Sequence, residues 1–110
     1  MNEGEIWYVK FTGEGHEYSG RRPALVIQSN KQLKSTTVIT VMPLTSNINN
    51  RTVDYIFVGK SSQNNLFQDS LIKVYYIESF DKSRFNKKIG NLEPTILFEV
   101  KTYLQKHFGI

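Results

Sequence analysis

A chain of 110 residues without cysteine is expected to fold as one domain, residues 1–110, with neither disulfides nor thiolate metal sites. The composition is 39% hydrophobic and 13% aromatic, and no stretch approaches the ~20 apolar residues of a membrane span. The polar start of the chain, residues 1–5, differs from a signal peptide, so we expect a cytoplasmic protein with no membrane partner.

The net charge of +4 is distributed unevenly along the chain. The first 20 residues contain four glutamates and one lysine, a net charge of −3, which leaves +7 for residues 21–110. The densest basic cluster consists of Lys82, Arg84, Lys87 and Lys88. Such an asymmetry is typical of proteins with a polyanionic partner such as a nucleic acid, and solubility alone is the alternative explanation.

The first third of the chain predicts two strands joined by a loop. Residues 5–11 are rich in aromatic and β-branched side chains, and their alternation places Trp7, Val9 and Phe11 on one face of a strand. Residues 12–20 contain three glycines and no apolar periodicity, which indicates a loop. Residues 23–29 predict a second strand that is buried on both faces. Arg21 and Arg22 are therefore expected where the loop meets this strand.

The middle of the chain predicts further short strands separated by polar turns. Residues 30–35 are turn-like, residues 36–42 form a third strand closed by Pro43, and residues 53–58 form a fourth strand. Residues 70–80 hold one or two more strands, and Asp81 is expected to cap one helical turn over residues 81–85. A short edge strand is expected around Ile89.

The only long helix is predicted at the end of the chain. Pro94 suits the first helical position, and Gly109 can terminate the helix. The apolar stripe of this helix is expected to contain Leu97, Val100, Leu104 and Phe108. Five to seven short strands followed by one amphipathic helix predict a mainly β fold, a small, partly open barrel with the helix packed on it.

Several familiar kinds of site are absent from the sequence. There is no phosphate-binding loop, no dinucleotide fingerprint, no paired catalytic carboxylates and no zinc-ligand spacing, so no cofactor or metal is expected. The remaining candidate site combines His16 in the first loop with Arg22 and Thr45. If the second and third strands pair, Arg22 lies near Thr45 at the end of the barrel that also carries His16.

Six short segments follow one another in the order and spacing of a known family. Over nearly its whole length, the chain resembles the MazF/PemK/Kid toxins of bacterial type II toxin–antitoxin pairs. The segments that carry the resemblance are residues 4–7, 15–17, 20–27, 43–46, 69–70 and 80–84.

The resemblance implies an SH3-like barrel of the CcdB/MazF type that forms a homodimer. It implies a metal-independent endoribonuclease that cuts single-stranded RNA, often mRNA, at a short sequence and thereby inhibits translation and growth. It also implies a cognate antitoxin that covers the active groove with an extended segment.

The resemblance also implies roles for individual residues. The family's catalytic arginine, threonine and histidine fall on Arg22, Thr45 and His16. The residues expected to bind the substrate are Glu17, Ser46, Asn47, Lys73 and Tyr75. Two positions depart from the family pattern, because Tyr75 stands where relatives carry a carboxylate and Glu78 stands where they carry an arginine.

The proposed residues make chemical sense for RNA cleavage by attack of the 2′-hydroxyl on the adjacent phosphate. Arg22 carries a permanent charge whose planar fork matches two phosphate oxygens. Thr45 is better suited to orient the phosphate than to attack it, because no base is readable beside it. His16 titrates near neutrality and can serve as acid or base, while Tyr75 or Tyr76 can stack on a base.

Other interpretations of the same residues remain open. Without the resemblance, Arg22 is a loop brace and Thr45 a turn residue. The alternative functions are a non-catalytic SH3-like module that binds RNA or protein, and a gyrase poison of the CcdB kind, since fold does not fix function. In an endoribonuclease, the polar loops at residues 46–51 and 59–65 are expected to be mobile and to read the RNA sequence.

Overall fold

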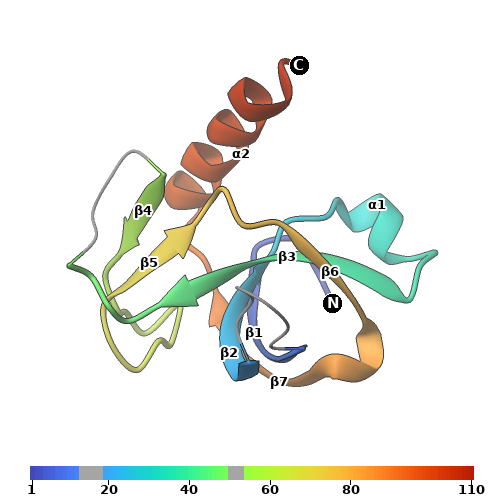
Figure 1. Ribbon diagram of the computed structural model, residues 1–110, viewed down its shortest axis with the longest axis horizontal. Coiled ribbons are helices and arrows are strands. Elements are labelled where there is room, and N and C mark those ends of the chain that lie inside the picture. Colours follow the sequence, from blue (N-terminus) through green and yellow to red (C-terminus); the bar gives the residue numbers. More distant parts are fainter. Residues whose placement is uncertain (13–18, 50–53) are drawn as a thin grey trace.

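The computed structural model of the protein describes residues 1–12, 19–49 and 54–110, and Figure 1 shows how their elements are arranged. In chain order the elements are β1 (Glu5–Thr12), β2 (Ser19–Val26), α1 (Asn30–Leu33), β3 (Val38–Thr45), β4 (Tyr55–Val58), β5 (Ser70–Lys73), β6 (Glu78–Asp81), the 3₁₀ turn η1 (Lys82–Arg84), β7 (Phe85–Asn91) and α2 (Pro94–Phe108). In the described part of the chain, no helix is long and apolar enough to cross a membrane.

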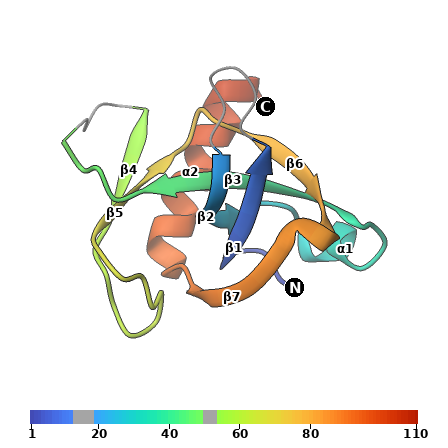
Figure 2. The same cartoon turned by 60° about the horizontal axis from the view of Figure 1, so that its bottom comes forward.

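The strands form one antiparallel sheet in the order β4-β5-β3-β2-β1-β7, and β6 pairs separately with β3. β3 is the strand that joins the two halves of the sheet, because Val38 to Val41 pair with β6 whereas Leu44 and Thr45 pair with β5. Figure 2 shows β1 and β2 lying between β3 and β7, with the sheet curving around them. The sheet stays open rather than closing into a barrel, which confirms the predicted mainly β, partly open architecture.

The apolar residues divide into two clusters on the curved sheet. One cluster lies under α2 and includes Ile6, Leu25 and Val100. The other cluster includes Val9 and Phe11, with Trp7 packed against it, so the predicted common face of the first strand is confirmed. β1, β2 and β3 each supply residues to both clusters, so the two halves of the core are built around these three neighbouring strands.

The second and third strands differ from their predicted bounds. β2 begins at Ser19 and ends at Val26, so both arginines lie inside the strand instead of in the preceding loop. β3 continues through Pro43 to Thr45, although a proline was expected to close it. The reason is the change of partner along β3, because the pairing with β6 ends at Val41 and the pairing with β5 begins at Leu44. At Pro43 the missing N–H therefore costs no hydrogen bond on that side.

α2 confirms the predicted terminal helix in its start and its stop. Pro94 occupies the first turn, and Gly109 ends the helix in the left-handed conformation with a φ of 67°. Val100 is fully buried, but Phe108 is 58% exposed, so the predicted apolar stripe stops before the last turn. The physical reason is visible in Figure 1, where the C-terminal end of α2 projects beyond the sheet.

The shorter elements follow the sequence more closely. Asp81 caps η1 through a 2.9 Å hydrogen bond from the backbone N–H of Ser83, as predicted. The expected edge strand around Ile89 is β7, which pairs with β1. Residues 30–35 were expected to be a turn, but they contain the short helix α1 because the hydroxyl of Ser29 caps the N–H of Gln32.

The polar segment 59–65 is held against the sheet, contrary to the expectation of a mobile loop. The fully buried Asn64 donates from Nδ2 to the carbonyl of Gly59 at 2.8 Å and to Oε1 of Glu93 at 3.1 Å. Its Oδ1 accepts from the backbone N–H of Ser61 at 3.0 Å and of Leu66 at 3.1 Å. The side-chain amide of Asn64 uses its donors and its acceptor in hydrogen bonds within the protein, so it is not free to pair with an RNA base.

The Glu93 carboxylate links this loop to the start of α2. Burial alone would raise its pKa, but hydrogen bonds from Ser61 and Asn64 and from the backbone bring the pKa below its ordinary value of 4.5. Its Oε2 accepts from Ser61 Oγ at 2.7 Å. The stability that comes from the ionised carboxylate is therefore present above the unfolded-state pKa and is lost as the pH falls through the folded-state pKa.

We expect Glu93→Gln to lower the free energy of unfolding by about 1 kcal/mol at pH 7, because a charge-assisted hydrogen bond becomes a neutral one. The difference from the wild type should shrink as the pH falls through the folded-state pKa of Glu93, which lies below 4.5, because the carboxylate then becomes protonated. Urea unfolding over a series of pH values from 7 downward measures this effect. Glu99→Gln, at an exposed position of α2, is the matched control, and a loss that does not shrink at acid pH would contradict the prediction.

Candidate active site

Arg22 and Thr45 are brought together by the register of the central strands. β2 and β3 pair in an antiparallel manner with Ala24 opposite Pro43, which meets the condition on which the expected closeness of Arg22 and Thr45 depended. Continuing this register by two residues places Arg22 of β2 across from Thr45 of β3. The pairing between the two strands ends at Ala24 and Pro43, and Thr45 pairs with Leu71 of β5 along the other edge of β3. Beyond the paired residues, space remains beside the Arg22 and Thr45 side chains.

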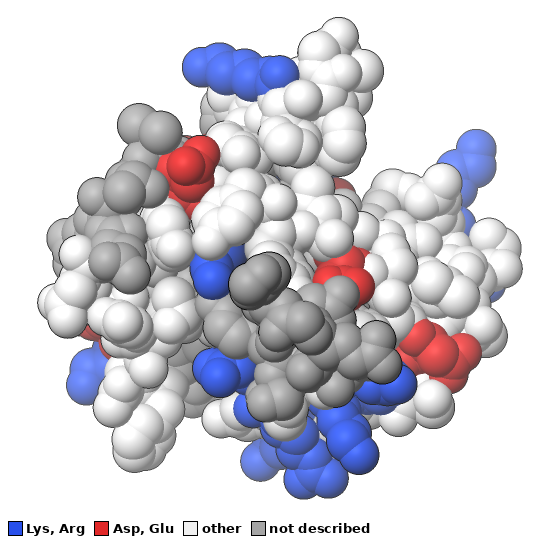
Figure 3. Space-filling model, in the orientation of Figure 1, with Lys and Arg blue, Asp and Glu red and all other residues white. Residues whose placement is uncertain are grey.

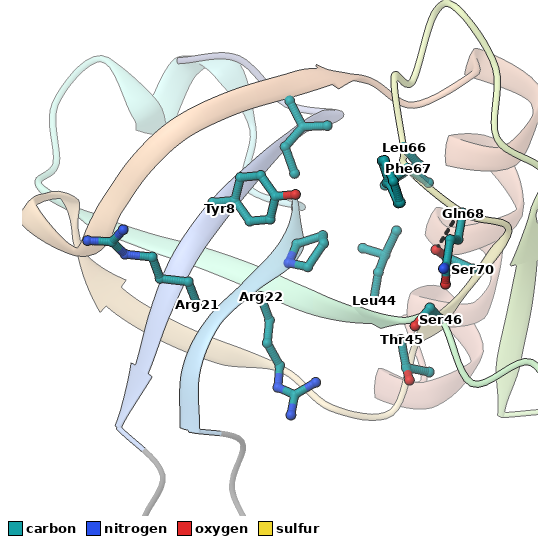
Figure 4. Close-up of a pocket in the computed structure, with 12 residues that line it drawn as sticks. Tyr8, Arg21, Arg22, Leu44, Thr45, Ser46, Leu66, Phe67, Gln68 and Ser70 are labelled. Carbon is teal, nitrogen blue, oxygen red and sulfur yellow. Dashed lines mark hydrogen bonds between the residues drawn. The ribbon is translucent and has the colours of Figure 1, made fainter.

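That space is a pocket of about 310 Å³ whose lining includes both predicted catalytic residues (Figure 4). Its walls come from four parts of the chain, namely β1 and β2, the end of β3, the segment that enters β5, and β7. The full lining consists of Tyr8, Arg21, Arg22, Pro23, Leu44, Thr45, Ser46, Leu66, Phe67, Gln68, Ser70 and Ile89. The volume lies in the range of sites that hold small ligands or parts of larger ones.

The two arginines of β2 have different surroundings because alternate residues of a strand point to opposite faces. Arg22 is half-buried and its Nε atom is fully buried, so the fold restricts where its guanidinium can lie. Arg21 is exposed, and Figure 4 shows its side chain pointing away from that of Arg22. Of the two, only Arg22 has the restricted geometry that a phosphate-binding guanidinium requires.

Thr45 is the last residue of β3, and its hydroxyl shapes the turn that follows. Its Oγ1 accepts a 3.2 Å hydrogen bond from the backbone N–H of Asn47. The Oδ1 atom of Asn47 in turn accepts from the N–H of Asn49 at 3.3 Å. Ser46 and Asn47 are both exposed. The hydroxyl proton of Thr45 is not used by the Asn47 bond, so it can be donated to a ligand in the pocket.

Lys73 and Tyr75 form a second group at the end of β5 and in the turn after it, outside the lining of the pocket. Lys73 ends β5, and its Nζ lies 5.6 Å from the centre of the Tyr75 ring. The hydroxyls of Tyr75 and Tyr55 are 3.2 Å apart, and the two rings meet edge to face at 5.7 Å. Tyr75 is 41% exposed. At the position where the family pattern has a carboxylate, this chain therefore presents a pair of phenol groups beside an ammonium.

Three further sequence predictions meet different outcomes. His16 and Glu17 lie outside the described residues. Tyr75 and Tyr76 were expected to alternate in a strand, but they follow β5 in a turn, where Tyr76 donates its backbone N–H to the carbonyl of Lys73 at 3.0 Å. The hydroxyl oxygen of Tyr76 is buried, whereas the neighbouring Tyr75 is exposed.

Several lining residues, among them Tyr8, Phe67 and Gln68, were not singled out as site residues in the sequence. Tyr8 was assigned only to a strand, and Phe67 and Gln68 stand in a segment without periodicity. Phe67 is 87% exposed although it is one of the largest apolar side chains. The only feature in the sequence that pointed to Phe67 was a phenylalanine following a polar segment. Without the structure, such a residue cannot be distinguished from a core residue.

One edge of the molecule carries a concentration of positive charge. Lys and Arg side chains gather along the lower edge of the molecule in Figure 3. Part of the predicted basic cluster is committed to internal contacts, because Lys88 lies 3.4 Å from Glu5 and Arg84 donates to the carbonyl of Lys10 at 3.3 Å. Burial would raise the pKa of Glu5, but hydrogen bonds from Trp7 and Asn2 and the charge of Lys88 lower it overall. The ionised Glu5 thus neutralises one lysine of the cluster.

Within the described ranges there is no cluster of three or more His, Cys, Asp or Glu residues that could hold a metal ion. The polar groups that line the pocket include guanidinium groups and several hydroxyls, and the ammonium of Lys73 lies outside this lining. Such a set binds anions and donates protons to oxygen atoms. The fold and the site together define a small, basic, open-sheet protein that is equipped to hold a phosphodiester.

Residues 2–108 match a protein family described as PemK-like, MazF-like toxins of type II toxin–antitoxin systems. The chain belongs to this family, which confirms the resemblance found in the sequence. The match spans nearly all of the chain, including the strands that carry Arg22 and Thr45.

Individual relatives agree with the family assignment. The chain is similar to a protein named endoribonuclease MazF of Staphylococcus saprophyticus, with 25% identity over 100% of this chain and 92% of the relative. It is also similar to endoribonuclease MazF9 of Mycobacterium tuberculosis, with 28% identity over 100% and 98%. Among solved structures, MazF of Deinococcus radiodurans has the same fold, with a TM-score of 0.83 at 24% identity over 100% and 97% of the two chains.

Proposed function

We propose that this protein is the toxin of a type II toxin–antitoxin pair and that it cuts single-stranded RNA without a metal. The observation that carries the proposal is the convergence of Arg22 and Thr45 on one pocket of a basic protein. Membership of the toxin family and the endoribonuclease names of its relatives support the enzyme prediction. Cleavage of mRNA would inhibit translation and growth.

The proposed reaction is an attack of the RNA 2′-hydroxyl on the adjacent phosphorus. The bond from O2′ to phosphorus forms and the bond from phosphorus to O5′ breaks. The proton of the 2′-hydroxyl goes to a base, and O5′ receives a proton from an acid. The products are a 2′,3′-cyclic phosphate and a 5′-hydroxyl. Arg22 holds the phosphate oxygens as negative charge accumulates on them, and Thr45 orients the phosphate by donating its hydroxyl proton.

The proton transfers and the remaining substrate contacts are assigned to residues that the family resemblance implies. His16 remains the candidate for acid or base, since an imidazole titrates near neutrality. Lys73 lies against Tyr75 and supplies positive charge to the RNA backbone, while Glu17, Ser46 and Asn47 are proposed substrate contacts. The linked hydroxyls of Tyr55 and Tyr75 supply the proton donor at the position where relatives have a carboxylate.

The deciding experiment is cleavage of a long single-stranded RNA by the purified protein in EDTA. We expect fragments that end in 2′,3′-cyclic phosphate or 3′-phosphate, cut at a short recurring sequence. Salt-sensitive binding of the RNA without any product would instead favour a non-catalytic RNA-binding module. The phenol pair at Tyr55 and Tyr75 is the observation that keeps this second function open.

We expect Thr45→Val to lower kcat of RNA cleavage by about 10- to 100-fold, because the variant keeps the shape of the side chain but loses the donor to the phosphate. Thr45→Ser retains the hydroxyl and should keep most of the activity. Initial rates on a single-site RNA oligonucleotide, with circular dichroism to verify folding, measure both variants. Equal losses in the two variants would contradict a function of the hydroxyl.

A cognate antitoxin is the proposed protein partner. One structural neighbour is an endoribonuclease in complex with its cognate antitoxin from a Mycobacterial species, with a TM-score of 0.80 at 19% identity over 100% of this chain and 96% of that one. Another is a MazE–MazF complex of Deinococcus radiodurans, with a TM-score of 0.77 at 21% identity over 100% and 96%. We further propose that residues 1–110 act as one domain and that the protein works as a homodimer in the cytoplasm.

A further inference from the structure

The most unusual side chain of the site is Phe67, which lies at the rim of the pocket and is 87% exposed. A phenylalanine in water forgoes the hydrophobic stabilisation that burial would provide, so such an exposed ring is often part of a binding surface. The residues on either side of it are fixed. Leu66 is buried, and the hydroxyl of Ser70 donates to the carbonyl of Gln68 at 2.9 Å.

The segment that carries Phe67 is preorganised by the fold. The backbone N–H of Leu66 donates to Oδ1 of the fully buried Asn64 at 3.1 Å, which ties the segment to the anchored loop before it. Asn65 Nδ2 also donates to the carbonyl of Ile89 at 3.1 Å. Phe67 is therefore presented by a restrained backbone on both sides, which lowers the entropy lost when a ligand stacks on its ring.

The wall opposite Phe67 is also aromatic. Figure 4 shows Tyr8 on one side of the pocket and Leu66 and Phe67 on the other, with Leu44 between them. Tyr8 is 36% exposed, so part of its side chain is available at the surface. The exposed amide of Gln68 can both donate and accept hydrogen bonds. A flat, heteroaromatic ligand fits walls of this kind, because it stacks on aromatic faces and pairs its edge with an amide.

The same pocket reaches Arg22 and Thr45, the residues proposed to hold the scissile phosphate. We propose that the pocket between Phe67 and Tyr8 is a subsite for the nucleobase next to the cleaved bond. Phe67 stacks on this base and Gln68 contacts its edge. This inference rests on the proposed endoribonuclease function. The guanidinium at the pocket and the net charge of +4 favour RNA over an apolar peptide as the occupant.

The subsite is tested by mapping every cut that the wild type and three variants make in one long RNA in EDTA. Stacking of a base contributes about 5- to 150-fold in affinity, so we expect Phe67→Ala to lower kcat/KM at the preferred sites by about 10- to 100-fold. The preference at one nucleotide beside the cut should also relax. Phe67→Trp should restore both the rate and the preference, because it retains an aromatic face.

The matched control is Phe98→Ala, which removes another highly exposed phenylalanine, on α2 outside this pocket. It should leave the cut sites and rates unchanged. If Phe67→Ala cuts the same sites at wild-type rates, the subsite is wrong while the endoribonuclease function stands. A loss of activity that accompanies dissociation in analytical ultracentrifugation would make Phe67 a contact between copies of the chain and would also overturn the subsite.

If the wild type cuts no RNA, the proposed function fails and the subsite is judged by binding alone. The probe is then an RNA hexamer of random sequence with 2-aminopurine as its third base. Quenching of its fluorescence by the wild type and by Phe98→Ala, but not by Phe67→Ala, would support a base-binding pocket. Equal quenching by all three proteins, or none, would overturn it. If an antitoxin peptide bound at Phe67 and the RNA probe did not, the pocket would be assigned to a protein partner instead.

Discussion

Replacing Arg22 by alanine is expected to lower the rate of RNA cleavage by about 100- to 1,000-fold, the usual consequence of removing one preorganised donor to a developing anion. The half-buried guanidinium at the pocket is the feature that makes the loss large. RNA binding should weaken much less, because the other cations on the surface still attract the phosphates. The measurement is kcat on a single-site RNA, with a separate binding titration under non-cleaving conditions.

Two control variants sharpen this prediction. Arg21→Ala removes a neighbouring arginine whose side chain points away from Arg22, so it should cost far less activity (Figure 4). Arg22→Lys retains the charge but loses the planar fork, and it should recover only part of the rate. Thermal unfolding must show that Arg22→Ala remains folded. Full activity of a folded Arg22→Ala, or equal losses at positions 21 and 22, would remove Arg22 from the proposed mechanism.

Replacing Gly90 by alanine is expected to destabilise the fold by about 3 kcal/mol, at the upper end of what overpacking costs. A Cβ atom at this position would lie 2.4 Å from the backbone oxygen of Asn64 and 2.7 Å from that of Gln63. These atoms belong to backbone that is hydrogen-bonded in place, for example by the 3.1 Å bond from the N–H of Asn91 to the carbonyl of Gln63. The melting temperature should fall by ~10–15 °C.

Gly59→Ala is the matched control for Gly90→Ala, because its Cβ would meet nothing closer than the Phe57 ring at 3.7 Å. It should be neutral, or stabilising by up to about 1 kcal/mol through the unfolded state. Differential scanning calorimetry compares both variants with the wild type. Because Gly90 supports the loop that presents Phe67, Gly90→Ala should also reduce RNA cleavage at temperatures where it is still folded. If Gly90→Ala proved as stable as Gly59→Ala, the backbone at Gln63 and Asn64 would be able to move away from the added methyl group without loss of stability, which would contradict the prediction.

Local patterns predicted most of the elements correctly. Alternation placed Trp7, Val9 and Phe11 on one face, and Pro94 and Gly109 marked the start and stop of α2. The errors occurred where tertiary contacts override local preference. Pro43 lies inside a strand because β3 changes partner there, and segment 59–65 is immobilised by Asn64, whose partners are spread between Gly59 and Glu93.

The candidate site was predicted in part. The pairing of Arg22 with Thr45 followed from the expected antiparallel neighbours, and the structure places both in the lining of one pocket. Phe67 was missed because a sequence does not distinguish a phenylalanine exposed at a pocket rim from one in the core. Gln68, its neighbour in the same segment, was missed with it. Lys73 and Tyr75 were chosen only through the family resemblance, and their contact with Tyr55 required the structure.

Composition, periodicity and short motifs were sufficient for the class of fold, its terminal helix and the family, and they predicted that Arg22 and Thr45 lie close together. These features depend on local preferences and on the alternation of side chains, which a sequence displays directly. Which residues share the pocket, and which polar side chains are committed to the core, depends on strand register and on loops that meet far along the chain. Such contacts arise only when β3 exchanges partners and residues 59–65 pack on β7, so the tertiary structure was needed to identify them.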